Sequence, residues 1–172
     1  MKFKLSNKKT QLFSFDYFVA ISLFLLLLSL CLVTYTNNLR RLYEKVLFER
    51  MSNSAQGALD VLVHSSGIPF NWENEMSALT QLGLMEGEYK ISPAKLDALK
   101  TLTYEEVKKY LGLQNYEFYL RLTNLNGNTQ WEIGSKPEGE VGITLRRYVF
   151  LDNEVAILEL TVWCQSFYGG EY

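Results

Sequence analysis

A run of 23 residues without a charged side chain, Tyr17 to Leu39, limits what this chain can fold into more than any other feature. Asp16 and Arg40 bound the run, and its centre, Ile21 to Val33, is largely leucine. A helix of about 20 apolar residues crosses the hydrocarbon core of a bilayer. Aromatic side chains, which are typical of membrane interfaces, stand near both ends of the run: Phe15, Tyr17, Phe18 and Tyr35. The sequence therefore predicts one membrane-spanning helix, with the lipid bilayer as its partner.

The charges on either side of the run predict its orientation. Four lysines and no acidic residue occur in the first ten residues, and basic residues accumulate on the cytoplasmic side of membrane helices. We therefore expect a cytoplasmic N-terminus, with the residues after the run outside the cell membrane. From Thr36 onward the chain has 13 basic and 18 acidic side chains, a net charge of −5. This balance argues against a nucleic-acid partner, because phosphate contacts need clustered Lys and Arg.

An apolar N-terminal run also occurs in secretory signals, lipoprotein signals and plain signal anchors. A removable secretory signal ends in a small-x-small cleavage site, and the residues from Leu30 to Tyr35 contain none. A lipoprotein signal has a small residue before the modified cysteine, whereas Leu30 precedes Cys31. A plain signal anchor fits the composition fully. A disulfide between Cys31 and Cys164 is not expected, since it would join the bilayer to the outer domain.

The residues from Lys8 to Ala20, KKTQLFSFDYFVA, join a basic leader to the start of the apolar run. They resemble the class III signal peptide of archaeal type IV pilin-like proteins, in which Gly or Ala, then Gln, then Ser and an acidic residue precede the hydrophobic helix. The resemblance implies that a prepilin peptidase cleaves between Thr10 and Gln11 and leaves the helix in place. The chain has Thr10 where Gly or Ala is usual. One extra residue before Ser14 makes Asp16 the sixth mature residue rather than the fifth.

Asp16 has two interpretations. A carboxylate at the edge of the hydrocarbon is costly unless it is paired, and the resemblance implies that its partner is the free amino group of a neighbouring subunit. Alternatively, Asp16 lies in the headgroup layer as an ordinary interface residue. The sequence favours neither interpretation over the other.

Helical periodicity continues beyond the apolar run. Spacings of three and four predict one apolar stripe along a helix, formed by Leu42, Val46, Leu47, Met51, Ala55, Ala58, Leu59 and Leu62. No proline interrupts the pattern before Ser65–Pro69, so we expect one helix from about Phe13 to His64. The predicted organisation is a leader at 1–10, a transmembrane helix at 11–39, its amphipathic extension at 40–66 and an outer domain at 67–172.

Three short helices are expected in the first part of the outer domain. The first covers Asn74–Leu82. Ser92 before Pro93 places an N-cap and a first-turn proline at the start of the second, and Thr103 with Glu106 forms a capping box at the start of the third. The side chains expected to face the core from the last two helices are Leu96, Leu99, Val107, Tyr110 and Leu111.

Four strands are expected in the second part of the domain: Tyr116–Leu122, Thr129–Ile133, Ile143–Leu151 and Glu154–Trp163. Only two residues join the last two strands, which predicts a tight hairpin. Its register places Arg146 opposite Glu159 on one face. On the other face it pairs apolar residues, Leu145 with Leu160 and Val149 with Ala156. Arg147 also lies on that apolar face, and no feature of the sequence accounts for it.

Side chains suited to chemistry are few. The single histidine, His64, is expected at the end of the long helix, where a cation interacts favourably with the helix dipole. The sequence contains no metal-ligand spacing of His or Cys and no glycine-rich phosphate loop. Ser65 and Ser66 lack the surroundings of a nucleophile, and Trp72 is expected to anchor the turn after Pro69 rather than to bind a sugar. We therefore predict no enzyme activity, no catalytic residue, no cofactor or metal, and no small-molecule substrate.

Together these features predict an α+β protein, with a long N-terminal transmembrane and amphipathic helix followed by a small outer domain of short helices and an antiparallel β-sheet. Short segments of the domain, from Gly67–Glu73 to Tyr116–Tyr119, follow an order similar to that in archaeal secreted pilin-like proteins. The resemblance implies a structural subunit or minor pilin of a type IV-like surface filament, with other pilin-like subunits as partners. The alternative is a membrane-anchored binding module outside the cell that does not polymerise.

Overall fold

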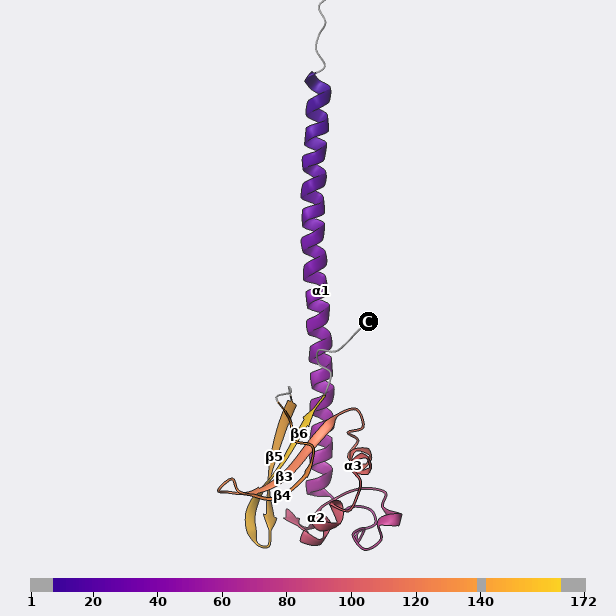
Figure 1. The fold of residues 1–172 in the computed structure, drawn as a ribbon, viewed down its shortest axis with the longest axis vertical. Coiled ribbons are helices and arrows are strands. Elements are labelled where there is room, and N and C mark those ends of the chain that lie inside the picture. Colours follow the sequence, from indigo (N-terminus) through magenta and orange to yellow (C-terminus); the bar gives the residue numbers. More distant parts are fainter. Residues whose placement is uncertain (1–7, 139–141, 165–172) are drawn as a thin grey trace, which may run out of the picture. The chain divides into compact units, whose positions relative to one another are not determined.

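The computed structural model of the chain describes residues 8–138 and 142–164, and the side chains of residues 8–14 lie outside that description. The chain forms two compact units, Met1–Val46 and Leu47–Tyr172, called here the helical unit and the globular unit. The first helix, α1 (Lys8–His64), contributes residues to both units. Figure 1 shows its last turns beside the strands of the globular unit.

α1 is one uninterrupted helix of 57 residues. The predicted end at His64 is confirmed, whereas the helix begins at Lys8 and not at Phe13. No proline or glycine lies between those two positions, so the sequence contains nothing that would prevent the earlier start. Beyond the helix, Gly67 has a positive φ of 88°, a conformation that glycine adopts without steric cost.

Six strands form one mixed sheet in the globular unit. They are β1 (Met85–Gly87), β2 (Lys90–Ile91), β3 (Glu117–Asn124), β4 (Thr129–Gly134), β5 (Gly142–Leu151) and β6 (Glu154–Trp163). Their order across the sheet is β1-β2-β5-β6-β3-β4. β2 and β5 pair in parallel through Lys90 and Phe150, and the other neighbours are antiparallel. The prediction of a wholly antiparallel sheet is therefore wrong at one edge, where two very short strands that the sequence did not indicate extend the sheet.

The register predicted for the β5–β6 hairpin is confirmed. The paired residues include Arg146 with Glu159, Leu145 with Leu160, and Val149 with Ala156. The two linking residues, Asp152 and Asn153, have positive φ angles of 49° and 69°, as a type I′ turn requires. Because the side chains of a strand alternate between two faces, this register puts Leu145 and Val149 toward the core and Arg146 on the outer face.

Two of the three predicted short helices are confirmed, and the first of these is α2 (Pro93–Leu99). Pro93 occupies the first turn as expected. Ser92 stands at the N-cap position, but its side chain makes no capping hydrogen bond. Leu96 and Leu99 are buried in the core, as the sequence predicted.

The second confirmed helix is α3 (Tyr104–Tyr110), and its capping box is present. The Thr103 N–H donates to the Glu106 carboxylate at 2.9 Å, and the Glu106 N–H donates to the Thr103 hydroxyl at 3.4 Å. Gly112 follows the helix with a φ of 68°, which is the usual geometry of a glycine just past a helix end.

The helix predicted over Asn74–Leu82 is wrong. Only Met76–Ala78 is helical, as the short 3₁₀ turn η1. The residues after it bond to an upstream segment instead: the Ile68 N–H donates to the Gln81 carbonyl at 2.9 Å, and the Thr80 N–H donates to the Ile68 carbonyl at 2.8 Å. These long-range bonds replace the local bonds that a helix would have made.

Trp72 holds this folded-back segment in place. Its ring is fully buried, and its indole N–H donates to the Gly83 carbonyl at 2.9 Å, so the anchoring role predicted for Trp72 is confirmed. Gly83 itself packs against the chain just after α1. A Cβ at this position would lie 2.3 Å from both the Gly67 nitrogen and the Ser65 carbonyl oxygen, so only glycine fits.

The core of the globular unit combines the inner face of the sheet with one face of α1. α1 contributes Met51, Ala55, Ala58, Leu59, Leu62 and Val63, which are all buried. Leu42 and Val46, predicted to lie on the same stripe, are 58% and 44% exposed. At 3.6 residues per turn, Leu42 and Met51 point to opposite sides of the helix. The prediction of one continuous stripe is therefore wrong for its N-terminal part.

Candidate functional site

The residues that the sequence singled out for leader processing lie in the first turns of α1. Thr10 and Gln11 belong to the residues whose side chains are outside the described part of the structure. Asp16 is exposed on α1, and it makes no hydrogen bond or ion pair with another described residue. Its own chain therefore supplies no partner for this carboxylate within the described residues.

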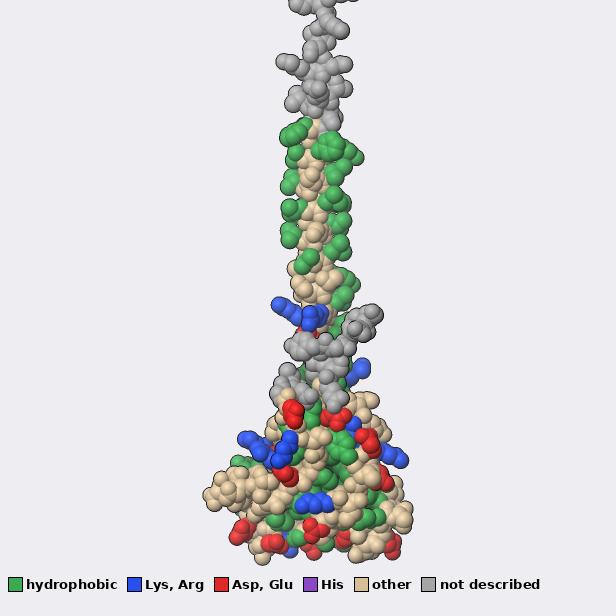
Figure 2. Space-filling view, viewed as in Figure 1, with side chains coloured by type: hydrophobic (Ala, Val, Ile, Leu, Met, Phe, Trp, Pro, Cys, Tyr) green, Lys and Arg blue, Asp and Glu red, His purple; other side chains and the backbone are tan. Residues whose placement is uncertain are grey.

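Exposed apolar side chains line the helical unit. None of the most apolar 18-residue window of α1 is buried, and by length and composition this helix is able to cross a membrane. Figure 2 shows these apolar side chains along the helix. No charged side chain is visible among them on the face that is drawn. A helix that is apolar on every side is normally surrounded by lipid or by other protein.

Hydroxyl side chains in this stretch bond to the backbone of the same helix. Ser22 donates to the Phe18 carbonyl at 2.8 Å, Thr36 donates to the Val33 carbonyl at 3.0 Å, and Thr34 donates to the Leu30 carbonyl. Such bonds give the hydroxyl groups a partner without water. The polar atoms of these three residues are therefore compatible with an apolar surrounding.

Within the globular unit, an ion pair that the sequence did not reveal links the end of α1 to the sheet. The Nη2 atom of Arg147 on β5 lies 3.1 Å from Oδ1 of Asp60 on α1. This contact accounts for the arginine on the apolar side of β5. Both side chains are partly exposed, so we expect the pair to contribute modestly to stability and mainly to fix which face of α1 meets the sheet.

Lys95 on α2 is buried, and its ammonium group joins two segments of the chain. Its Nζ atom donates to the Ser66 carbonyl at 2.7 Å and to the Met85 carbonyl at 3.1 Å. The same atom lies 4.7 Å from the centre of the Phe70 ring. Burial lowers the pKa of Lys95 below its ordinary value. Lys95 was not among the residues predicted from the sequence, although its spacing of four from Leu99 places it on the core-facing side of the helix.

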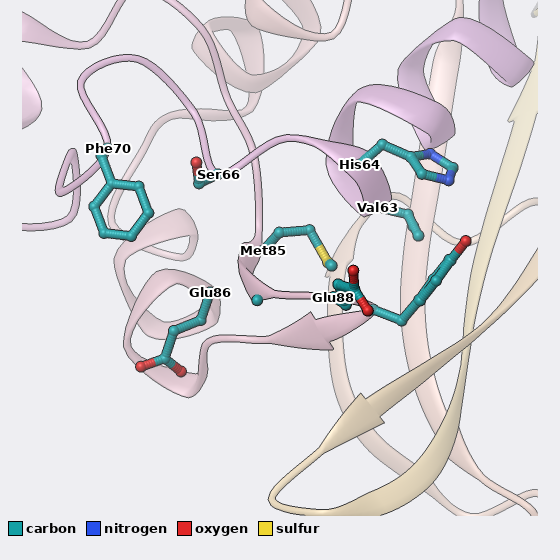
Figure 3. Close-up of a pocket in the computed structure, with 9 residues that line it drawn as sticks. Val63, His64, Ser66, Phe70, Met85, Glu86 and Glu88 are labelled. Atoms are coloured by element: carbon teal, nitrogen blue, oxygen red, sulfur yellow. The ribbon is translucent and has the colours of Figure 1, made fainter.

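A pocket of about 510 Å³ lies beside the two segments that Lys95 joins. Its lining comes from the end of α1, the loop after it, and β1 with the turn that follows. Residues that line it and are labelled in Figure 3 include Val63, His64, Ser66, Phe70, Met85 and Glu88. No described lysine or arginine lines the pocket, whereas two glutamates, Glu86 and Glu88, do.

His64 takes the place at the helix end that the sequence predicted, and it forms one side of the pocket. Its Nδ1 atom lies 3.1 Å from the Asp60 carbonyl oxygen. Its ring meets the Tyr89 ring edge-on, with 6.1 Å between the ring centres. The histidine therefore links the helix end to the turn between β1 and β2.

A partly buried polar link joins α3 to β3 away from the pocket. The Tyr104 hydroxyl donates to the Glu117 carboxylate at 2.6 Å, and the Lys108 ammonium donates to the same carboxylate at 3.0 Å. Burial, together with the bond to Glu117, raises the pKa of Tyr104 to about 12. The bond from the Tyr104 hydroxyl lowers the pKa of Glu117. These groups satisfy one another and connect two elements.

Charges on the outer face of the sheet are also paired internally. Glu159 on β6 is buried between Arg146 on β5 and Arg121 on β3, and it bonds to both. Arg121 lies opposite Glu132 on β4, which accepts a hydrogen bond from Tyr119. This row of alternating charge stabilises the sheet and leaves the pocket as the stronger candidate for binding.

Among residues 8–138 and 142–164, no three His, Cys, Asp or Glu residues come together as potential metal ligands. Comparison with known proteins gives no match: no family model fits the chain, and no curated protein or solved structure is significantly similar to it. The fold and the exposed helix nevertheless define a structural class. It is an α+β domain built on the end of an N-terminal helix that is long and apolar enough to cross a membrane.

Proposed function

We propose that this chain is a non-enzymatic, single-pass membrane protein of the pilin-like type, acting as a structural subunit or minor pilin of a type IV-like surface structure. In this proposal its N-terminus is cytoplasmic and its globular unit lies outside the cell. The observation that carries the proposal is α1 itself. Its apolar N-terminal part is exposed, whereas its turns from Met51 to Val63 supply core residues. α1 thus supplies both the apolar stretch that is proposed to span the membrane and part of the core of the globular unit.

The leader residues have defined roles in this proposal. A prepilin peptidase cleaves between Thr10 and Gln11, as the resemblance implies, and removes the lysine-rich leader. Gln11 then carries the new amino terminus. Asp16 finds no partner in the described part of its own chain, and it pairs with the amino terminus of a neighbouring subunit.

Mass spectrometry of the N-terminal peptide tests the proposal on protein from membrane fractions. We expect a mature chain that starts at Gln11. A chain that starts at Met1 or Lys2 would contradict leader processing. The variant Gln11→Ala should reduce the cleaved fraction, whereas Gln56→Ala, which changes an exposed glutamine further along α1, should leave it unchanged.

The alternative function is a membrane-anchored binding module that does not polymerise. The pocket of about 510 Å³ in the globular unit favours this alternative, because a purely structural subunit does not need one. Immunogold electron microscopy of intact cells distinguishes the two functions. Labelled filaments support a subunit, and label confined to the cell membrane, together with an uncleaved N-terminus, supports the binding module.

A further inference from the structure

We infer that the outer face of the sheet, at the turn end of the β5–β6 hairpin, packs against the same face of a second copy of this chain. The contact involves the globular units alone. The inference goes beyond the proposed function, because a two-fold pair closes on itself, whereas a filament grows through contacts that do not close. It rests on an apolar pattern in the two strands, on how their exposed side chains match across a two-fold axis, and on the balance of charge beside them.

The two strands of the hairpin are apolar on both faces near their turn. β5 ends with the apolar run Tyr148–Leu151, and β6 continues after Glu154 with the apolar run Val155–Leu158. A strand with one face in water alternates apolar and polar residues, whereas an uninterrupted apolar run is typical of strands that are covered on both faces. The core covers the inner face of these runs. The pattern therefore predicts a cover for the outer face as well.

The apolar side chains on the outer face are exposed in the part of the chain that the structure describes. Tyr148, Phe150 and Val155 are 70%, 45% and 38% exposed, and Ile157 is half-buried. Tyr148 pairs with Ile157 in the sheet, and Phe150 pairs with Val155. The four side chains therefore form one contiguous surface, called here the outer patch. A contiguous apolar surface bounded by polar residues is typical of an interaction site.

The shape of the outer patch matches itself across a two-fold axis. An axis parallel to the hairpin, above the gap between β5 and β6, places β5 of one copy over β6 of the other. The aromatic side chains of Tyr148 and Phe150 then lie over the smaller, β-branched side chains of the second copy, Val155 and Ile157. Large residues over small ones let two layers interdigitate, and aligned sheets pack face to face in this way.

The charges next to the outer patch balance across the same axis. Arg146 lies on the outer face two residues before Tyr148, and it pairs with Glu159 in the sheet. The axis sets Arg146 of each copy opposite Glu159 of the other, so the four central charges are two positive and two negative. Arg121, the second partner of Glu159, lies one strand further from the axis on β3. It belongs to the polar rim that surrounds the centre of an interface.

The size of the outer patch suits copies that are held close together. Aromatic side chains bury about 150–250 Å² each, so the exposed parts of Tyr148 and Phe150 offer on the order of 200 Å². A specific interface buries about 800 Å² on each partner. The outer patch therefore supplies an apolar centre that needs a polar rim and a high local concentration. Anchoring of both copies in one membrane, as in the proposed function, provides that concentration.

The direction of the strands fits two copies in one membrane. Arg147 on β5 meets Asp60 on α1. Three residues further along β5, Phe150 donates to the Tyr89 carbonyl, and the Tyr89 ring contacts His64, four residues further along α1. β5 therefore runs in the same direction as the last turns of α1. A two-fold axis parallel to β5 leaves these turns of both copies pointing the same way.

Crosslinking between introduced cysteines tests the inference on the full chain in liposomes. Both native cysteines are first replaced, as Cys31→Ser and Cys164→Ser. Val155→Cys then places one thiol in the outer patch with little change of volume. Packed sheets lie about 10 Å apart, so a bismaleimide with an ethylene bridge should join two facing patches into a covalent dimer. The control is Glu105→Cys on α3, outside the outer patch, where the native side chain is 79% exposed. A dimer yield no higher for Val155→Cys than for this control would overturn the inference and leave a different protein or the lipid surface as the cover.

A second substitution in the Val155→Cys chain sharpens the test. Tyr148→Glu should lower the dimer yield about tenfold, as expected when an aromatic side chain at the centre of an interface is lost. Tyr148 is 70% exposed, so the globular unit should still fold. The matched control is Phe70→Glu, which changes an aromatic side chain that is 63% exposed outside the outer patch, and it should leave the yield unchanged. An unchanged yield in Tyr148→Glu, as expected if copies met only through α1, would contradict the inference, and so would an equal loss in Phe70→Glu.

Discussion

Two parts of α1 share one continuous helix but differ in how apolar residues are arranged around its axis. Residues 17–39 carry no charge on any side of the helix, and the most apolar window is wholly exposed. From Met51 to Val63 the apolar residues lie on one face, which is buried, while Asp60 on another face meets Arg147. The distribution of apolar side chains around the helix axis, more than their number, therefore separates a helix that needs lipid from one that needs a folded domain.

Truncation of one leucine in each part should have different consequences for folding. Leu59 is fully buried, so Leu59→Ala should lower the free energy of unfolding of the globular unit by about 2–5 kcal/mol. Leu26 is 55% exposed, so Leu26→Ala should change the free energy of unfolding of the globular unit by less than about 0.5 kcal/mol. Tryptophan fluorescence during denaturant unfolding measures this, since Trp72, Trp131 and Trp163 all belong to the globular unit. Equal effects would remove the distinction between the two parts.

A charge placed in the apolar part should affect insertion and not folding. Leu26→Arg should disfavour membrane insertion by about 2.5–3.5 kcal/mol, the usual cost of arginine at the centre of a spanning helix. The fraction of protein that resists alkaline extraction from membranes reports this change. Leu26→Val is the control and should remain inserted. Normal extraction resistance of the arginine variant would show that this stretch is not in the hydrocarbon.

Acid should lower the free energy of unfolding of the globular unit and should not affect the apolar part of α1. The pKa of Glu117 is lowered in the folded state by the hydrogen bond from Tyr104 and by Lys108. Its contribution is therefore present above the ordinary glutamate value of 4.5 and is lost as the pH falls through the lowered folded-state pKa.

Glu117→Gln should cost about 1.5–3 kcal/mol at neutral pH and should flatten the loss of stability below about pH 4. The control is Glu105→Gln, whose carboxylate also approaches Lys108, at 4.0 Å, but is 79% exposed. Chemical denaturation at a series of pH values measures both effects. A Glu117→Gln profile as steep as that of the native chain would refute the assigned role.

The smallest expected effect concerns the contact that orients α1 on the sheet. Asp60→Asn should lower the free energy of unfolding by about 0.2–1 kcal/mol, because the pair with Arg147 is partly exposed. A double-mutant cycle with Arg147→Gln isolates this coupling. A coupling energy of zero would mean that the pair does not help to set which face of the helix is buried.

Local patterns predicted most of what the structure contains. The capping box at Thr103 and Glu106 and the β5–β6 hairpin both depend on residues close together in the sequence, so spacing and turn chemistry were sufficient. The position of His64 at the end of α1 followed from periodicity. The turn anchor Trp72 was predicted as a role, but its partner, the Gly83 carbonyl, was not.

Features that depend on distant residues were missed. β2 has only two residues and pairs in parallel with β5, which no pattern in Lys90–Ile91 indicates. The helix predicted over Asn74–Leu82 does not form, because Thr80 and Gln81 make backbone hydrogen bonds with Ile68 instead. The partner of Arg147 lies 87 residues away on α1. For the same reason the sequence did not reveal the pocket, whose walls come from separate segments joined by the buried Lys95.

Labelling of the two native cysteines tests the central claim most directly. Both are free thiols: Cys31 lies in the apolar part of α1, and Cys164 follows β6. With a membrane-impermeant maleimide on intact cells, and single-cysteine variants Cys31→Ser and Cys164→Ser to assign the signals, we expect Cys164 to react and Cys31 to stay protected until detergent is added. Reaction of Cys31 on intact cells as readily as Cys164 would contradict a membrane-spanning helix with the globular unit outside.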